Sequence, residues 1–291
     1  GMAEYMRQLE GKWFRPALVL FSTGLFKGDR KRAAVIAAAL ELIHNATLIH
    51  DDIIDESDMR RGSQAVWKQW GNSATVLMGD LLYAKAFELT TGFGDIAIQR
   101  VIAEATGRMC QGELQQLESS GNIHVTEQEY LQVISLKTAC LISACTQCGA
   151  MIAGADAEAV DLMRRFGLSL GMAFQIVDDV LDFVADPKEL GKTVGNDLAR
   201  GKVTLPLIHL LSYCKNPEPV ISLLTGNSPA TTFDLSEALS SSQSIEYAYG
   251  MACRYGENAD RLLDSLGRFE IASVGIEHLK RLVEFVVSRR F

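Results

Sequence analysis

The sequence predicts an all-α protein, because helical periodicity covers most of the chain and no stretch alternates as a strand does. Only six prolines interrupt 291 residues, so long helices can form. Between Arg32 and Asp55, for example, apolar residues recur three and four positions apart, as one face of a helix requires. We expect roughly nine to twelve helices in a single domain over residues 1–291.

Similar apolar stripes follow along the chain at about 74–92, 95–118, 126–153, 157–184 and 202–214, with two or three more between 245 and 290. Gly92 and Gly94 separate the first two of these stripes. Thr126 and Glu129 form a capping box that begins the third. Residues 216–244 are rich in Ser, Thr, Pro and Asn, so we expect the most mobile region there.

Composition narrows the function classes. The net charge is −8, which argues against nucleic acid as a partner. We expect no transmembrane helix, because no run of about 18 apolar residues without charges occurs, and no signal peptide is visible. Cys145 and Cys148 form a lone Cys-x-x-Cys without a second pair, so no zinc site is predicted there. The cysteine pattern suits a protein of a reducing compartment. These observations predict a cytoplasmic location.

Two apolar stretches end in the pattern Asp-Asp-x-x-Asp, at Asp51-Asp52-Ile53-Ile54-Asp55 and Asp178-Asp179-Val180-Leu181-Asp182. Residues four apart lie about 40° apart around a helix, so the first and fifth aspartates of each pentad share a face. Like charges at that spacing repel, and acids near a helix C-terminus oppose its dipole. The alternative is a pair of solvated acidic helix ends, but the preceding residues are apolar. Carboxylate pairs of this kind suit Mg²⁺, which binds few carboxylates plus substrate phosphates.

Basic residues gather near the pentads in the sequence. Lys137 is the most telling, because a lysine inside an apolar helix needs a partner. Acids that hold Mg²⁺ together with arginine and lysine predict a diphosphate site, since the bases neutralise the remaining phosphate oxygens. The candidate bases are Lys12, Arg15, Arg60, Arg61, Lys137, Lys192 and Lys202.

Two further polar residues share helix faces with the aspartates. His44 lies seven residues before Asp51, hence about 20° from it around the helix, although it can equally be an ordinary hydrogen-bonded helix histidine. Gln175 shares a stripe with Asp179 and Asp182 between apolar neighbours. An amide there could stabilise developing positive charge.

With these motifs assembled, the chain resembles the trans-isoprenyl diphosphate synthases, the polyprenyl synthetase family, from Gly11 to the tail at Arg289. The matching motifs are Gly-Lys-x-x-Arg-Pro, His-x6-Asp-Asp-x-x-Asp-x4-Arg-Arg-Gly, Gly79-Asp80, Lys137-Thr138, Phe174-Gln175-x-x-Asp-Asp-x-x-Asp and two lysine loops. One motif departs from the family: Glu10 precedes Gly11 and Trp13 replaces the usual first arginine, which predicts a weaker phosphate contact.

The resemblance implies antiparallel helices around a deep central cavity, a homodimer, and three Mg²⁺ ions per active site. It implies that an allylic diphosphate, farnesyl or geranylgeranyl, is joined head to tail to isopentenyl diphosphate, and that pyrophosphate is released. A long product of this kind would serve as a quinone side chain and make at most transient contact with a membrane.

The resemblance also implies a role for each matching residue. Metal binding falls to Asp51, Asp55 and Asp178, assisted by Asp52, Asp179 and Asp182. The allylic diphosphate would contact Arg60, Lys137, Lys192 and Lys202, and isopentenyl diphosphate would contact Lys12, Arg15, His44, Arg61 and a tail arginine such as Arg289. Thr138 and Gln175 would steady the allylic cation.

Product length is predicted from the residues before the first pentad. In the family, bulky residues four or five positions before it form a cavity floor, whereas Thr47 and Ala46 are small here. This resembles long-chain, octaprenyl-type synthases. Helix geometry points Thr47 towards the cavity, about 40° from Asp51, but Ala46 about 140° away. Candidates for a deeper floor are Phe87, Met78 and Met151.

Four alternatives stay open. A short-chain synthase would share every motif except the small residues. A terpene cyclase usually replaces the second pentad with an Asn/Ser/Glu motif. An inactive partner subunit should have lost aspartates, yet all six are present. A di-iron bundle matches only at Glu41-x-x-His44, without the second Glu-x-x-His that it needs.

Overall fold

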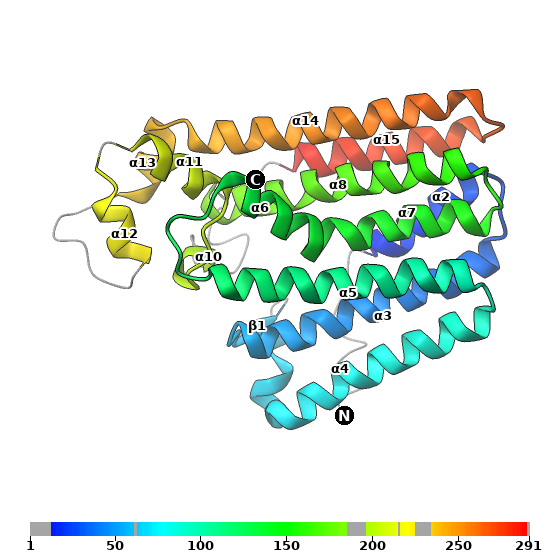
Figure 1. Cartoon of the computed structure of the whole chain (residues 1–291), viewed down its shortest axis with the longest axis horizontal. Coiled ribbons are helices and arrows are strands. Elements are labelled where there is room, and N and C mark those ends of the chain that lie inside the picture. The colour runs from blue at the N-terminus through cyan, green and yellow to red at the C-terminus, as the bar shows by residue number, and fades with distance from the viewer. Residues whose placement is uncertain (1–12, 61–62, 185–195, 215, 225–233, 290–291) are drawn as a thin grey trace.

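The computed structural model describes residues 13–60, 63–184, 196–214, 216–224 and 234–289, and almost all of them are helical (Figure 1), which confirms the all-α prediction. The long helices are α2 (Phe14–Leu25), α3 (Arg30–Ile54), α4 (Val66–Phe93), α5 (Ile96–Ser119), α7 (Cys140–Ile152), α8 (Ala157–Val184), α14 (Ser244–Asp264) and α15 (Ser273–Ser288). The shorter ones are α6 (Glu127–Ile134), η1 (Ser135–Ala139), α10 (Asn196–Ala199), α11 (Leu205–Tyr213), α12 (Glu218–Leu224), α13 (Leu235–Ser241) and η2 (Ser265–Arg268).

The predicted stripes coincide with these helices closely. α8 spans the predicted 157–184, and the capping box at the start of α6 is present, with Thr126 Oγ1 accepting from Glu129 N. Gly94, at φ 78°, ends α4, whereas Gly92 lies inside that helix. The region expected to be mobile contains α12 and α13. The small antiparallel pair of β1 (Met59–Arg60) and β2 (Ser63–Gln64) was not predicted.

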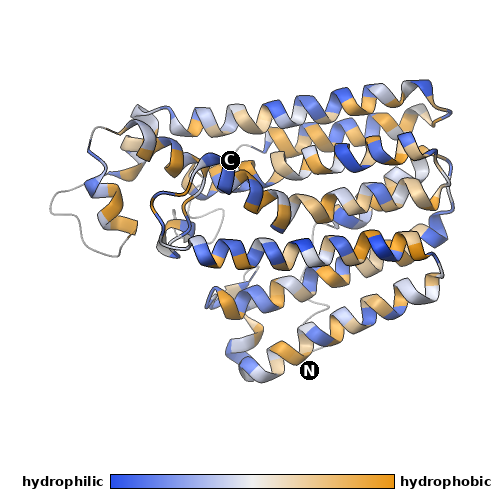
Figure 2. Cartoon of the chain, viewed as in Figure 1, coloured by the Kyte–Doolittle hydropathy of each residue, from blue (hydrophilic) through white to orange (hydrophobic). Residues whose placement is uncertain are grey.

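The long helices lie side by side, and α8 packs against α7, α14 and α15 (Figure 1). Apolar and polar residues alternate along each helix, as amphipathic packing requires (Figure 2). α8 joins two cores: Phe166 and Leu170 belong to a core shared with α2, α3, α5 and α7, while Ile176 and Val180 belong to one shared with α6 and α11. Burying each such side chain contributes about 1.5–3 kcal/mol, so α8 is held firmly in place.

One segment departs from regular α-helix. Between α6 and α7, η1 is a turn of π-helix that contains Lys137 and Thr138. Two glycines let neighbouring helices touch its backbone, because a Cβ at Gly112 would lie 2.6 Å from Lys137 N and one at Gly171 would lie 2.5 Å from Ala139 Cα. Single π-turns within helices occur frequently at functional sites.

Two helical stretches, Arg30–Ile54 and Glu127–Ile152, are long and apolar enough to cross a membrane by length and composition alone. Half of the most apolar window of the first and two thirds of that of the second are buried inside the protein. Core helices of a bundle meet the same criterion, and α3 and α7 are core helices here.

Candidate active site

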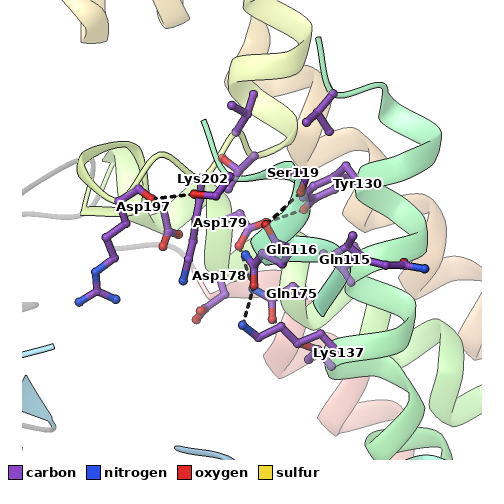
Figure 3. Close-up of a pocket in the computed structure, with 18 of the residues that line it drawn as sticks. Gln115, Gln116, Ser119, Tyr130, Lys137, Gln175, Asp178, Asp179, Asp197 and Lys202 are labelled. Carbon is purple, nitrogen blue, oxygen red and sulfur yellow. Dashed lines mark hydrogen bonds between the residues drawn. The ribbon is translucent and has the colours of Figure 1, made fainter. Parts of the chain in front are cut away.

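Both pentads line one cavity of about 720 Å³, although 122 residues separate Asp55 from Asp178 in the chain, counting the residues between them. The first pentad lies at the end of α3, where Asp55 is the C-cap, and the second lies in the last two turns of α8. Figure 3 shows the side of the cavity formed by α5, α6, η1 and α8. The pentad aspartates that line it are Asp51, Asp55, Asp178, Asp179 and Asp182, and Asp197 lines it as well.

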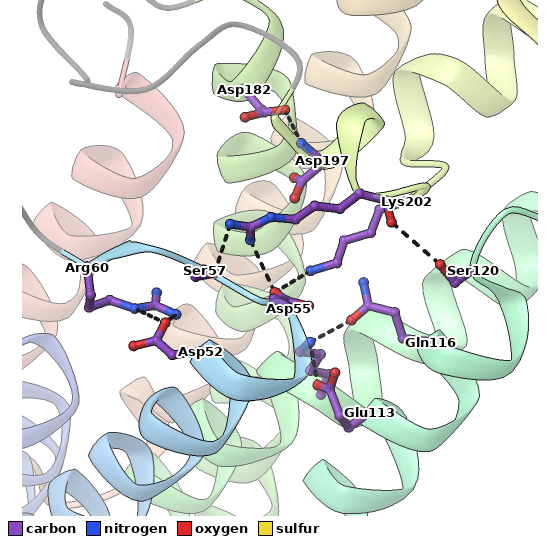
Figure 4. Close-up of polar contacts among 12 residues, drawn as sticks. Asp52, Asp55, Ser57, Arg60, Glu113, Gln116, Ser120, Asp182, Asp197 and Lys202 are labelled. Atoms are coloured by element: carbon purple, nitrogen blue, oxygen red, sulfur yellow. Dashed lines mark hydrogen bonds and ion pairs between the residues drawn. The ribbon is translucent and has the colours of Figure 1, made fainter. Parts of the chain in front are cut away.

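Asp52 is the pentad residue that does not line the cavity. It is 2% exposed, and its Oδ1 accepts from Arg60 Nε and Nη2 at 2.8 and 2.5 Å (Figure 4). Burial raises the pKa of Asp52, and the hydrogen bonds from Arg60 oppose that rise. Arg60 itself lines the cavity. The predicted metal role of Asp52 therefore rests on the resemblance alone, and the geometry gives it a partner in Arg60.

Asp179 is equally enclosed, at 5% exposed, and holds a chain of hydrogen bonds. Its two oxygens accept from Tyr130 Oη at 2.6 Å and from Gln175 Nε2 at 2.8 Å (Figure 3). Gln175 Oε1 in turn accepts from Thr138 Oγ1 at 2.7 Å. Burial raises the pKa of Asp179, and the neighbouring carboxylate of Asp197 adds to the rise. The structure thus brings Thr138 and Gln175 together, with both on the cavity wall.

Cations meet the first pentad at Asp55. Its Oδ2 accepts from Lys202 Nζ at 2.8 Å and from Arg200 Nη1 at 3.2 Å, while Arg200 Nη2 also donates to Ser57 Oγ at 2.8 Å (Figure 4). Burial acts to raise the pKa of Asp55, but Lys202, Lys137 and Arg200 together outweigh it and the pKa is lowered overall. Asp55 is therefore held as a carboxylate by two bases from the segment between α10 and α11.

Lys137 has the partners that its place in an apolar helix required. Its Nζ donates to Gln116 Oε1 at 2.5 Å and forms an ion pair with Glu113, both on α5. Burial works against the charge of Lys137, yet Asp51 and Glu113 raise its pKa overall, so the ammonium persists. Burial also raises the pKa of Asp51 to about 6, with Lys137 opposing the rise and Glu113 adding to it.

These aspartates suit a divalent cation. The donors are all oxygen, they come from α3 and α8 to one cavity, and at Asp51 burial disfavours the charged form unless a cation is near. Among the described residues, no three His, Cys, Asp or Glu side chains converge closely enough to hold a metal by themselves. That pattern fits Mg²⁺, which usually keeps substrate phosphates as ligands.

The residues predicted to bind the second substrate are only partly brought to this cavity. Arg289 lines it, 4.0 Å from Asp178, with its guanidinium 4.2 Å from the ring centroid of Phe174. Arg15 and His44 do not line it. Lys12, Arg61 and Lys192 lie outside the described residues.

The predicted chain-length residues lie beside the cavity and not on its wall. Ala46 is fully buried, and Thr47 Oγ1 donates to His44 O at 2.8 Å, whereas Leu48 is the neighbour that lines the cavity. The three candidates for a deeper floor, Met78, Phe87 and Met151, are not among the lining residues either. Phe87 is 43% exposed on α4.

Several site residues were missed from the sequence. Glu113, Gln116 and Tyr130 stand in helical stripes with ordinary surface-type spacing, so nothing singled them out. Arg200 carried a usable signal, because it lies between Asp197 and Lys202 in the second lysine loop. The hydrogen bond from Asp197 N to Asp182 Oδ2, at 3.0 Å, ties that loop to the end of α8.

The comparisons with known proteins agree with this site. A model of the polyprenyl synthetase family matches residues 1–241. The chain is 41% identical to the geranylgeranyl diphosphate synthase of Sulfolobus acidocaldarius, over 96% of this chain and 87% of that protein. It is 38% identical to the octaprenyl diphosphate synthase of Escherichia coli, over 88% of this chain and 79% of that protein.

A solved structure has the same fold. The polyprenyl synthase of Caulobacter crescentus, complexed with calcium and isoprenyl diphosphate, is 33% identical to this chain. The match covers 100% of this chain and 88% of that chain, with a TM-score of 0.91. Family membership implies dependence on a divalent metal. The chain belongs to the polyprenyl synthetase family and is a trans-prenyl diphosphate synthase.

Proposed function

We propose that this enzyme extends farnesyl or geranylgeranyl diphosphate with isopentenyl diphosphate to a long, all-trans polyprenyl diphosphate. The observation that supports the diphosphate chemistry is the meeting of both pentads with Lys137, Lys202 and Arg289 around one cavity. The small residues Ala46 and Thr47 support a long product, because no bulky side chain stands four or five positions before the first pentad.

In this proposal the carboxylates of Asp51, Asp55 and Asp178 hold Mg²⁺, three ions by family resemblance, with Asp52, Asp179 and Asp182 assisting. Bound Mg²⁺ would neutralise charge on the departing diphosphate and so stabilise the transition state. Arg60, Lys137, Lys192 and Lys202 contact the same diphosphate, and Lys12, Arg15, His44, Arg61 and Arg289 bind isopentenyl diphosphate.

The carbon–oxygen bond of the allylic substrate then breaks, and the electron pair leaves with the pyrophosphate. The double bond of isopentenyl diphosphate attacks the allylic carbon, and loss of a proton to the pyrophosphate completes the new prenyl unit. Lysines and arginines aimed at the leaving group stabilise charge that develops only in the transition state. Thr138 and Gln175 present oxygen atoms to the allylic cation.

A short-chain product is the second candidate, favoured by the 41% identity to a geranylgeranyl diphosphate synthase and by Leu48 on the cavity wall. The test is incubation with farnesyl diphosphate, isopentenyl diphosphate and Mg²⁺, followed by dephosphorylation and chromatography. We expect alcohols longer than geranylgeraniol. Geranylgeraniol alone would establish the short-chain reading, and cyclic hydrocarbons or no product would overturn the proposal.

We further propose that the enzyme works as a homodimer in the cytoplasm, with transient membrane contact only at product release. α4 supports the dimer, because it covers α3 at the edge of the bundle (Figure 1). It also exposes the apolar side chains of Val76, Leu77, Leu81 and Phe87. Exposed apolar patches commonly mark interaction surfaces. Light scattering after gel filtration should give twice the monomer mass for the parent protein and a lower mass for Leu81→Glu.

A further inference from the structure

The part of the site with the most fixed geometry is the hydrogen-bonded chain Tyr130–Asp179–Gln175–Thr138. It crosses three elements: Tyr130 on α6, Asp179 and Gln175 on α8, and Thr138 on η1. Its links measure 2.6, 2.8 and 2.7 Å. All four residues border the cavity, and Tyr130 and Asp179 are each only 5% exposed.

The direction of the chain determines which atoms face the cavity. Gln175 turns its NH₂ group towards Asp179, because its Nε2 donates to Asp179 Oδ1 at 2.8 Å. The carbonyl oxygen of Gln175 then accepts a hydrogen bond from Thr138, and the Thr138 hydroxyl has no second proton to donate towards the cavity. What remains for the cavity are oxygen lone pairs, which attract positive charge.

The opposite orientation of the Gln175 amide would harm the reaction. A flipped amide would present N–H groups, which repel a carbon that is becoming positive. Asp179 prevents the flip, and Tyr130 holds Asp179, because its hydroxyl occupies the second carboxylate oxygen. Preorganised dipoles of this kind stabilise a transition state without reorganising as it forms.

We infer that Tyr130 and Asp179 are positioning residues that fix the Gln175 amide with its oxygen towards the allylic cation, and that the main role of Asp179 is this one and not metal binding. The inference rests on the proposed function, since it presumes an allylic cation in this cavity. It assigns to Asp179 a role that differs from that of its neighbour Asp178, whose side chain is 59% exposed.

The test compares two ligands on each variant by calorimetry. One is inorganic pyrophosphate with Mg²⁺, which reports the metal and diphosphate site. The other is an allylic diphosphate analogue with a protonated amine at the ionising carbon, which adds the developing positive charge. The variants are Tyr130→Phe and Asp179→Asn. Tyr247→Phe is the matched control, because Tyr247 Oη donates to Glu127 Oε2 at the same 2.6 Å but does not line the cavity.

For Tyr130→Phe and Asp179→Asn we expect binding of the ammonium analogue to weaken about tenfold and binding of Mg²⁺-pyrophosphate to stay within twofold. Turnover should fall about tenfold while the KM for the allylic substrate stays within twofold. Tyr247→Phe should change neither ligand.

Equal weakening of both ligands by Asp179→Asn would overturn the inference in favour of a metal role. Unchanged binding of both ligands by Tyr130→Phe would overturn it as well, since the hydroxyl would then be only structural. A parent protein that bound Mg²⁺-pyrophosphate yet did not elongate any prenyl substrate would refute the proposed function itself.

Discussion

The two pentads share one sequence pattern but are neutralised by different groups. In the first pentad, cationic side chains bind the carboxylates: Arg60 binds Asp52, and Lys202 and Arg200 bind Asp55. In the second, the hydrogen bonds that the described residues make come mainly from neutral donors: Tyr130 and Gln175 bind Asp179, and the backbone N–H of Asp197 binds Asp182. Arg289 stands farther off, 4.0 Å from Asp178.

This difference separates what helix geometry dictates from what the surroundings add. In both pentads the second aspartate is buried, while the first and fifth are less buried and line the cavity. Asp179 also borders the cavity, whereas Asp52 does not. The deeper burial of the second position follows from the 100° step between neighbouring residues of a helix. The partners differ, however: within the described residues, cationic side chains bind the first pentad, while a tyrosine, a glutamine and a backbone N–H bind the second.

The largest effect is expected from Asp178→Asn. The substitution removes the charge of an exposed carboxylate and loses little packing, so folding should be intact. Turnover should fall by about a thousandfold, since metal stabilisation of the leaving group is worth several kcal/mol. Steady-state kinetics at saturating Mg²⁺ would measure it. The exposed Asp58, which pairs with Lys68, gives the control Asp58→Asn, and near-normal activity of Asp178→Asn would rule out the assignment.

The second prediction concerns stability and the first pentad. Arg60→Gln leaves Asp52 buried without its cation, which should lower the free energy of unfolding by about 2–3 kcal/mol, less than for a fully enclosed pair because Arg60 is 25% exposed. Urea unfolding would show it. Asp52→Asn in the same chain should restore part of the loss. Arg281→Gln removes an exposed ion pair with Glu277 and should cost under about 1 kcal/mol. Equal losses for the two arginines would contradict the comparison.

The helices and their apolar faces could be predicted from the sequence, because apolar residues recur at the three- and four-residue spacing of a helix. The pentads could be predicted too, since six aspartates in two identical patterns are a strong local signal. The partners could not: Tyr130 reaches Asp179 across 49 positions, and Lys202 reaches Asp55 across 147. Such contacts depend on how α6, α8 and the loop before α11 pack. The π-turn at Lys137 could not be predicted from the sequence for the same reason. It depends on close contacts with Gly112 and Gly171, which belong to other helices.

The third prediction separates the two bases on Asp55. Lys202→Gln should raise the KM for the allylic diphosphate about tenfold, because a charge-assisted bond to phosphate is lost along with the one to Asp55. Arg200→Gln should raise this KM less than threefold. In the parent protein the Arg200 guanidinium also donates to Ser57, next to the end of α3, so it is less available than Lys202 to bind phosphate. Initial rates at varied allylic diphosphate would measure both. A larger effect for Arg200 would reverse their roles.

The smallest effect on rate, but a visible one on product, is expected upstream of the pentads. Four positions before the second pentad stands Phe174, stacked on Phe14 with ring centroids 5.4 Å apart, whereas the first pentad has Thr47 at the equivalent place. The α8 side therefore carries an aromatic ring where the α3 side carries a small side chain. Thr47 is next to Leu48, which lines the cavity. Thr47→Phe should therefore narrow the cavity and shorten the product by several prenyl units, with turnover within about threefold.

Chromatography of the dephosphorylated products would measure this change. Ala46→Phe should shorten the product too, but at a cost of about 1–3 kcal/mol in stability, because Ala46 is fully buried and a ring there overpacks the core. Ala97→Phe, on an exposed face of α5, is the matched control and should leave the product unchanged. An unaltered length in both Thr47→Phe and Ala46→Phe would show that neither residue limits the growing chain and that other residues decide the product length.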